Sequence, residues 1–220
     1  MVKHMEQKRL EELKQKLYSG VLCDVLDQLG YRNQAITSLR PLGDDTVLFG
    51  PAFTSIGTQV YSMPEHPLTA QCKVVDQLSA GEIYILATRG EYTCAVFGEL
   101  FATAVQQRHG AGVLLDGYAR DMRELKKMNF PMFYKGVNPK TSKGRCEINE
   151  CQIPIQIDGV TICPGDLIFA DIDGVVVIPQ AVADEVIERA LQTIVCEDKV
   201  RAGLQNGKSL EQVYGELGAI

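Results

Sequence analysis

Two polar segments in the middle of the chain contain residue types that could take part in chemistry. In the first, Gly98 precedes an apolar-periodic helical segment, so the backbone N–H groups of residues 98–101 are expected to lack partners at a helix N-terminus. Such a terminus attracts anions through the geometry of these groups and through the helix dipole. Glu99, in the first turn, also has a purely structural interpretation, because acidic residues stabilise that end of a helix. On spacing alone the segment favours helix stabilisation, with an anion site as the alternative.

The second segment, residues 113–121, is an apolar run followed by Asp116-Gly117 and then by Arg120-Asp121. Ligands of α/β proteins usually bind at loops that follow the carboxyl ends of strands. Asp121 offers a carboxylate for a hard cation, and Arg120 offers a planar guanidinium for a carboxylate ligand. Each part also has a structural interpretation. Asp116-Gly117 could form a turn, Asp121 could cap the next helix and Arg120 could belong to a surface ion pair.

Apolar periodicity and turn signals indicate the elements that must position these residues. Helices are predicted over residues 10–19, 21–29, 69–78, 99–108, 122–128, 181–204 and 209–217. Strands are predicted over residues 82–87, 112–115, 130–135, 153–157, 160–163, 167–171 and 175–178. Between residues 35 and 61, repeated proline and glycine predict only short extended runs.

These elements alternate along the chain without a linker or a repeat. We therefore expect a single domain over residues 1–220, with N-terminal helices in residues 1–30 and C-terminal helices in residues 181–217. The expected fold class is α/β, with a mixed β-sheet core of sandwich or barrel character. Helices should flank this core in a layered αββα arrangement.

Composition and charge exclude several classes of protein. The 220 residues are 45% hydrophobic and 23% charged, which is typical of a globular protein rather than a disordered or fibrous one. The net charge of −6 and the scattered basic residues argue against a nucleic-acid partner. No run approaches the roughly 20 apolar residues of a membrane span, and no hydrophobic signal core follows the polar N-terminus. We expect a cytoplasmic protein with no nucleic-acid or membrane partner.

The cysteines, histidines and lysines argue against several kinds of site. Seven irregularly spaced cysteines without a C-x-x-C pair, and three histidines far apart, predict neither a disulfide framework nor a zinc site. A Schiff-base lysine needs an apolar pocket that lowers its pKa. The lysines lie in polar contexts, none of them inside an apolar strand run. The lysine contexts therefore do not favour a Schiff-base mechanism.

The two polar segments, taken in order, resemble a known signature. Residues 98–104, Gly-Glu-Leu-Phe-Ala-Thr-Ala, and residues 112–121, Gly-Val-Leu-Leu-Asp-Gly-Tyr-Ala-Arg-Asp, are similar to the 4-hydroxy-4-methyl-2-oxoglutarate aldolase family. That family shares its fold with the regulator of ribonuclease E activity A. Residues 164–179, Pro-Gly-Asp-Leu-Ile-Phe-Ala-Asp-Ile-Asp-Gly-Val-Val-Val-Ile-Pro, resemble a second signature of the same superfamily. The resemblance extends in register from about residue 20 to residue 203.

The resemblance implies a class II pyruvate aldolase that depends on Mg²⁺ or Mn²⁺. Its substrate would be a 4-hydroxy-2-oxo acid such as 4-hydroxy-4-methyl-2-oxoglutarate or 4-carboxy-4-hydroxy-2-oxoadipate, with a sugar-acid derivative also open. Cleavage would give pyruvate through a metal-stabilised enolate, and oxaloacetate decarboxylation would be a side activity. The family also implies a homotrimer or homohexamer with its sites between subunits.

The same resemblance implies roles for particular residues. Asp121 matches the carboxylate that binds the metal, and Arg120 matches the arginine that holds the pyruvyl end of the substrate. Glu99 matches an acidic position that reaches the metal through water. Backbone amides that receive the substrate would belong to Gly98, Glu99, Leu100 and Phe101. Glu197 falls where an acidic residue of a neighbouring subunit completes the site, and it is the candidate general base.

Other parts of the resemblance are structural or point to different functions. Asp171 and Asp173, in the second signature, are expected to be turn and hairpin residues. A non-catalytic regulator of ribonuclease E, acting by protein contact, is the alternative function. Asp121 argues against it, because the regulator branch lacks that carboxylate. An S-adenosylmethionine methyltransferase would need a glycine-rich loop directly after an early strand, whereas Gly110-Ala-Gly112 precedes its strand.

Overall fold

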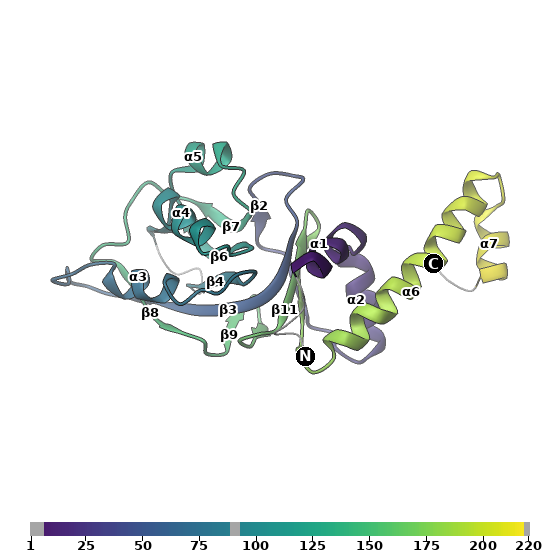
Figure 1. The fold of residues 1–220 in the computed structure, drawn as a ribbon, viewed down its shortest axis with the longest axis horizontal. Helices are drawn as coiled ribbons and strands as arrows, with labels where there is room; N and C mark the ends of the chain where they lie inside the picture. Colours follow the sequence, from purple (N-terminus) through teal and green to yellow (C-terminus); the bar gives the residue numbers. More distant parts are fainter. Residues whose placement is uncertain (1–6, 89–92, 218–220) are drawn as a thin grey trace.

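A computed structural model describes residues 7–88 and 93–217 of the chain (Figure 1). Residues 1–6, which include the polar stretch considered above, lie outside the described residues. The helices are α1 (Gln7–Lys16), α2 (Ser19–Gln28), α3 (Thr69–Val75), α4 (Glu99–Gln107), α5 (Met122–Lys127), α6 (Ala183–Gln205) and α7 (Leu210–Leu217). The strands before α5 are β1 (Ala35–Ile36), β2 (Arg40–Pro41), β3 (Leu48–Gln59), β4 (Ile83–Ala87), β5 (Ala95–Phe97) and β6 (Gly112–Ala119). The later strands are β7 (Met132–Val137), β8 (Cys146–Cys151), β9 (Ile155–Ile157), β10 (Val160–Ile162), β11 (Leu167–Asp171) and β12 (Gly174–Ile178).

The main sheet is mixed and curls on itself. Its strand order is β1-β12-β11-β3-β4-β6-β7-β2, with β5 beside β6 and β8 beside β3. Strands β3, β4, β6 and β7 pair in parallel, whereas β11 and β12 are antiparallel to their neighbours. The two edge strands, β1 and β2, are separated in the chain by residues 37–39 alone. Such a short connection requires the edges to approach one another, which confirms the predicted mixed sheet of barrel character.

Buried apolar side chains form three clusters that correspond to the layers of the fold. One lies between the sheet and helices α3 to α5 and includes Phe53, Phe97 and Leu115. A second is enclosed by the curled sheet and the β9–β10 hairpin, and a third lies under α1, α2 and α6. Each fully buried Leu, Ile or Phe side chain contributes on the order of 2 kcal/mol to folding. Helices therefore flank the sheet on both sides, as the sequence predicts.

Strand β3 is the main departure from the sequence prediction. The expectation of short broken runs is wrong, because β3 continues for 12 residues through Gly50, Pro51 and Gly57. A Cβ atom at Gly50 would lie 2.5 Å from the carbonyl oxygen of Gly81, so a close backbone approach requires glycine there. At Gly57 the pairing with β8 shifts register, which marks a bulge rather than a strand end.

Strand β6 is longer than predicted. It continues past Leu115 to Ala119, so the turn at Asp116-Gly117, considered above as a structural alternative, does not form. The polar side chain of Asp116 is accommodated because the ammonium group of Lys135, on adjacent β7, lies 3.0 Å from it. Strands β5 and β8 have no counterpart in the prediction. The predicted helices all occur, with ends displaced by a few residues.

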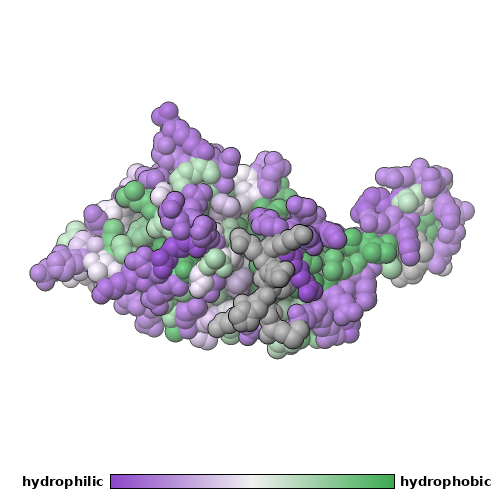
Figure 2. All heavy atoms as spheres, in the orientation of Figure 1, coloured by the Kyte–Doolittle hydropathy of each residue, from purple (hydrophilic) through white to green (hydrophobic). Residues whose placement is uncertain are grey.

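The C-terminal part of α6 and α7 extends away from the body of the molecule (Figure 1). The first turns of α6 bury Val186, Ile187 and Ala190 against the body. Further along, Val195 is 55% exposed, and Figure 2 shows a hydrophobic stretch between the body and α7. No helix in the described part of the chain, α6 included, is long and apolar enough to cross a membrane.

Candidate functional site

The carboxyl end of β6 positions Arg120 and Asp121. The Arg120 backbone N–H donates a hydrogen bond to the Phe97 carbonyl oxygen at 3.0 Å, which ties the end of β6 to the end of β5. On the other side, the Asn138 N–H donates to the Ala119 carbonyl oxygen at 3.0 Å. The two predicted polar segments are therefore neighbours in the structure, as the strand-end argument requires.

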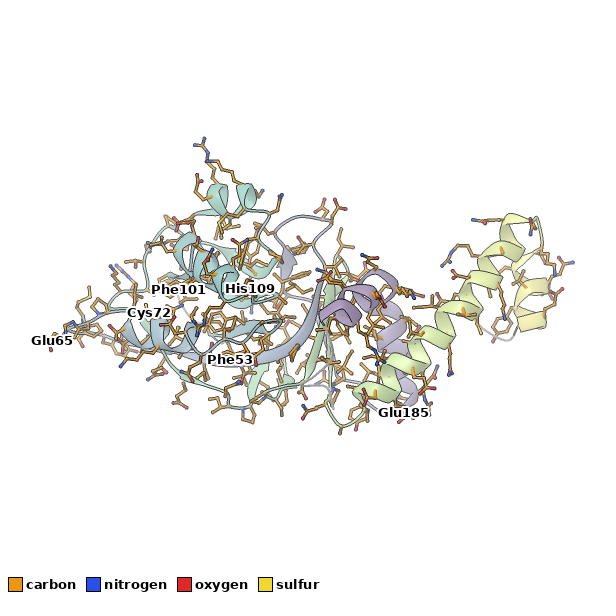
Figure 3. The ribbon with its side chains drawn as sticks, viewed as in Figure 1. Phe53, Glu65, Cys72, Phe101, His109 and Glu185 are labelled. Atoms are coloured by element: carbon orange, nitrogen blue, oxygen red, sulfur yellow. The ribbon has the colours of Figure 1, made fainter. Side chains whose placement is uncertain are left out.

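The N-terminus of α4 faces this strand end and is anchored by aromatic contacts. The ring of Phe101 stacks on Phe97 with centroids 6.1 Å apart, and Phe97 in turn packs against Tyr84. Tyr84 contacts Phe53, so Phe53 and Phe101, both labelled in Figure 3, mark the two ends of this series. The series connects β3 to α4 and holds the first turn of the helix in place.

The carboxylate of Asp121 lies directly against the start of α4. Its Oδ2 atom accepts a hydrogen bond from the Glu99 N–H at 3.4 Å and lies 3.5 Å from Nε of Arg120. A Cβ atom on Gly98 would come within 2.6 Å of the same oxygen. Glycine at position 98 is therefore a steric requirement of this arrangement, which the sequence pattern alone did not indicate.

The two structural interpretations, a helix cap by Asp121 and a stabilising surface ion pair of Arg120, explain little of the observed geometry. Asp121 occupies the N-cap position of α5 but makes no side-chain capping hydrogen bond, and its φ of 60° lies in the left-handed region. That conformation is unfavourable for a residue other than glycine, although aspartate tolerates it better than most. Both side chains are about 40% exposed, so their mutual ion pair contributes little to stability.

A small recess of about 70 Å³ opens between these groups. Gly98, Leu100, Phe101, Arg120 and Asp121 all line it, so the structure brings these five predicted residues together. Strand β5 contributes Ala95, Val96 and Phe97 to the wall, and Leu68, Thr141 and Ser142, which the sequence did not indicate, complete it. These last three follow no periodic pattern and lie outside the strands, in two segments distant from one another in the chain.

Glu99 and Asp121 present their carboxylates differently. The Glu99 carboxylate accepts a hydrogen bond from the Thr103 hydroxyl at 3.0 Å, one turn further along α4. Within the described residues, no group of three or more His, Cys, Asp or Glu side chains could enclose a metal ion. Mg²⁺ keeps several water ligands and needs only one or two carboxylates. The exposed carboxylate of Asp121 fits an ion of that kind, and a closed protein cage is absent from the described part.

Glu197 lies on α6, apart from the other predicted site residues of the same chain. It accepts a hydrogen bond from the Tyr18 hydroxyl. Burial, and next the bond to Glu197, raise the pKa of Tyr18 above its usual range, so this tyrosine stays a donor at neutral pH. Figure 3 places Glu185, at the start of α6, on the far side of the molecule from Phe101. Within one chain, Glu197 is not brought together with Arg120 and Asp121.

The aspartates of the second signature have structural roles, as expected. The carboxylate of Asp171 accepts hydrogen bonds from the backbone N–H and the hydroxyl of Ser19, both at 2.8 Å. It also accepts the backbone N–H of Asp173 at 3.1 Å within the β11–β12 turn. Asp171 therefore joins the hairpin to the start of α2.

Lys135 departs from the expectation that the lysines lie in polar contexts. It is a β7 residue beside a cavity of about 560 Å³ between the sheet and the β9–β10 hairpin. Its ammonium group contacts Asp116, whose side chain is 3% exposed. Burial lowers the pKa of Lys135, but the hydrogen bond and attraction to Asp116 outweigh this and raise it above the usual value. The lysine therefore stays protonated, unlike a Schiff-base nucleophile.

The chain is similar to several known proteins. It is 33% identical to a putative 4-hydroxy-4-methyl-2-oxoglutarate aldolase of Halalkalibacterium halodurans, over 77% of this chain and 76% of the relative. It is 29% identical to Protein DlpA of Legionella pneumophila over 88% of this chain, which spans only 31% of DlpA. The crystal structure of Streptomyces coelicolor RraAS2, described as an unusual member of the RNase ES inhibitor RraA family, superimposes with a TM-score of 0.78. That match is 25% identical and covers 90% of this chain and 98% of RraAS2. Because the family model described as "RraA-like: Aldolase/RraA" matches residues 20–177, the chain belongs to the RraA-like family.

Proposed function

We propose that this protein releases pyruvate from a 4-hydroxy-2-oxo acid with the help of a divalent cation. The observation that carries the proposal is the placement of Arg120 and Asp121 side by side at the N-terminus of α4. The guanidinium of Arg120 suits the substrate's carboxylate, because it offers two parallel donors. The N–H groups of Leu100 and Phe101, in the first helical turn, have no partner within the helix and can donate hydrogen bonds to a negatively charged group.

The proposed cation site consists of Asp121, with Glu99 contributing through water. Both Mg²⁺ and Mn²⁺ accept such oxygen donors. When bound, the cation supplies electrophilic stabilisation for charge that develops on the 2-oxo oxygen. The chain's own groups then have defined tasks. Arg120 orients the pyruvyl end, and the amides at the start of α4 exclude alternative orientations of its oxygens.

Aldol cleavage also needs a base that takes the proton from the 4-hydroxyl group. The C3–C4 bond then breaks, its electron pair remains on C3 as the pyruvate enolate, and a proton added at C3 gives pyruvate. We propose Glu197 of a neighbouring copy as this base. The extended α6–α7 arm with exposed Val195 supports an assembly in which the arm reaches another subunit, a homotrimer or homohexamer. Oxaloacetate decarboxylation reaches the same enolate without this base.

The first experiment measures pyruvate release from a panel of 4-hydroxy-2-oxo acids and from oxaloacetate, with and without a chelator. Activity should vanish in excess chelator and return with Mg²⁺ or Mn²⁺. Full activity in chelator, together with borohydride trapping of the protein on substrate, would falsify the proposed chemistry. Light scattering at the assay concentration tests the assembly, and an active monomer would exclude a base from a second subunit.

Variants separate the proposed roles of the two carboxylates. Asp121→Ala should abolish both aldol cleavage and decarboxylation, whereas Glu197→Gln should lose cleavage much more than decarboxylation. Asp24→Asn, an exposed aspartate on α2, is the control and should leave both rates unchanged. Equal losses of both activities in Glu197→Gln would remove Glu197 as the base.

A regulatory function is the second candidate, and the likeness to RraAS2 favours it. Such a protein would inhibit a ribonuclease of the RNase E type by surface contact and would need no metal. Inhibition of that ribonuclease by Asp121→Ala, combined with no pyruvate release by the native protein, would establish this candidate over the aldolase.

A further inference from the structure

The cavity of about 560 Å³ beside Lys135 lies toward the carboxyl ends of the parallel strands. Ile56 of β3 pairs with Ala87 of β4, and Ala87 pairs with Asp116 of β6, so these three lining residues form one row across the sheet. Lys135, on β7, extends the row through its contact with Asp116. Ligands of α/β proteins usually bind at this end of a sheet, and the volume lies in the range of small-molecule sites. The position and size of the cavity therefore suit a small ligand.

The β9–β10 hairpin covers this row of residues and is attached to the rest of the fold. Ile155, on β9, is buried and lines the cavity. The Asn33 side-chain amide donates a hydrogen bond to the Gly159 carbonyl oxygen at 3.1 Å. The Ser38 N–H donates to the Asp158 carboxylate at 3.2 Å. Both bonds connect the hairpin turn to the residues that flank β1, so the cavity is a fixed feature of the fold.

A buried ion pair lines the cavity and has unused hydrogen-bonding capacity. The Asp116 side chain is 3% exposed, and its Oδ1 atom accepts a hydrogen bond from the Lys135 ammonium group at 3.0 Å. Within the described residues, this is the one hydrogen bond that either charged group makes. An ammonium group has three N–H donors, and a carboxylate can accept about four hydrogen bonds. A buried pair is favourable only where further partners satisfy these groups, and the cavity is the space from which such partners can come.

The charges around the cavity favour a ligand that carries both signs. Asp158 also lines it. Burial lowers the pKa of Lys135, whereas Asp116 and, to a smaller extent, Asp158 raise it, so both carboxylates act on this ammonium group. A simple anion would be repelled by the two carboxylates, and a simple cation would be repelled by the ammonium group. A zwitterion avoids both penalties. Ile56 and Pro154 add an apolar surface for a hydrocarbon group.

We propose that this cavity binds an aliphatic amino acid. The ammonium group of the ligand donates hydrogen bonds to the carboxylates of Asp116 and Asp158, and its carboxylate accepts one from the Lys135 ammonium group. Its hydrocarbon side chain lies against Ile56 and Pro154. The cavity shares no lining residue with the recess at the start of α4, so the inference does not rest on the proposed function.

The test is a calorimetric titration of the protein, without added divalent cation, with leucine, 3-methylbutylamine and 4-methylpentanoate. The second and third compounds are leucine without its carboxylate and leucine without its ammonium group. The native protein should bind leucine at one site and should bind each analogue about tenfold more weakly, the ratio expected for loss of a charge-assisted hydrogen bond. Glycine, which lacks the hydrocarbon side chain, should also bind about tenfold more weakly than leucine.

Two variants of the cavity test the proposed contacts. Asp158→Asn removes the charge in the hairpin turn, while asparagine keeps an oxygen for the Ser38 N–H and tolerates the φ of 50° at this position. It should weaken leucine binding about tenfold without weakening the binding of 4-methylpentanoate. Asp116→Leu/Lys135→Met leaves no unpaired charge, so it should fold and should no longer bind leucine.

Two further variants are controls and should leave leucine binding unchanged. Asp24→Asn on α2 removes one carboxylate outside the cavity, and Arg120→Lys alters the recess. The proposal is overturned if leucine does not bind, if leucine and its two analogues bind equally, or if either cavity variant binds leucine as the native protein does. An equal effect of Asp24→Asn or Arg120→Lys would also overturn it, because bulk charge or the recess would then explain the binding.

Discussion

Replacing Gly98 by alanine tests whether the Asp121 carboxylate must lie against the start of α4. The added Cβ would be 2.6 Å from Oδ2 of Asp121 and 3.2 Å from Cγ of Arg120, whereas ordinary contact begins at 3.4 Å. The carboxylate must therefore withdraw by the difference between 3.4 and 2.6 Å, about 0.8 Å. The Arg120 side chain must give way by a smaller amount. The Asp121 carboxylate and the Arg120 side chain, the two groups proposed to hold the cation and the substrate, are therefore displaced together.

We expect Gly98→Ala to lower the rate strongly and to reduce the free energy of unfolding only slightly. A misplacement of about 1 Å at a reacting centre costs on the order of 10²-fold in rate, which corresponds to about 2.7 kcal/mol of lost transition-state stabilisation. The backbone of Gly98 is extended, with φ of −162°, so alanine adopts it without strain. The change from glycine to alanine at an N-cap costs on the order of 1 kcal/mol.

The assay is kcat/KM for pyruvate release, with the urea midpoint measured on the same preparations. Gly20→Ala is the matched control, because a Cβ there lies no closer than 3.6 Å to any neighbour. We expect Gly98→Ala to lose about 100-fold in kcat/KM with only a small shift of the midpoint, and Gly20→Ala to retain full activity. Near-native kcat/KM in Gly98→Ala would refute the reasoning, since the displaced Asp121 would then be dispensable.

Variants at three other contacts, and a pH titration of one of them, have defined expected outcomes. Arg120→Lys should lower kcat/KM for pyruvate release by roughly 10²–10³, because a point charge cannot replace the planar guanidinium; near-normal kinetics would contradict its proposed role. Asp116→Ala should reduce the free energy of unfolding in urea titrations by about 2 kcal/mol, less than for a fully buried pair because Lys135 is one-third exposed. The double variant Asp116→Leu/Lys135→Met should recover most of this loss, because it leaves no unpaired charge. Since the pKa of Lys135 is raised by folding, the pair's contribution should be intact below pH about 10.4 and disappear as the pH rises further. Asp171→Ala should cost about 1–2 kcal/mol in the same titration by uncapping Ser19 at the start of α2, while kcat/KM stays unchanged.

The sequence predicted those parts of the fold that depend on local periodicity. Helix α6, for example, has regularly spaced apolar residues, and the β9–β10 hairpin has a strong turn dipeptide at Asp158-Gly159. Strand β3 was missed because its Gly50 and Pro51 normally break strands. Glycine occurs at position 50 because the carbonyl oxygen of Gly81, from another part of the chain, approaches it closely. Such a tertiary contact has no local signal.

Like the fold, the candidate site was predicted only where its residues belong to short local patterns. Gly98, Arg120 and Asp121 belong to short motifs, so their types and order indicated them in advance. Ser142 and Thr141 were missed, because they reach the recess only through the hydrogen bonds that attach residues 138–145 to β5 and β6. The environment of Lys135 was also misjudged, because nothing in the neighbouring sequence of β7, Met132–Val137, indicates the partner of its charge. Its actual partner, Asp116, lies on the adjacent strand.

The short connection between β1 and β2 has a consequence for how the chain folds. Ala35 pairs with Val176, and Arg40 pairs with Tyr134, so closing the barrel joins residues far apart in sequence. Contacts of that range carry a large loop-closure entropy and slow folding. During synthesis, the β1 edge must wait until β12, which follows it by more than 130 residues, has left the ribosome. Until then the edges of the incomplete sheet are exposed to pairing with other chains. Barrel closure is therefore expected to be a late step of folding, and the nascent chain is most vulnerable to aggregation before that step.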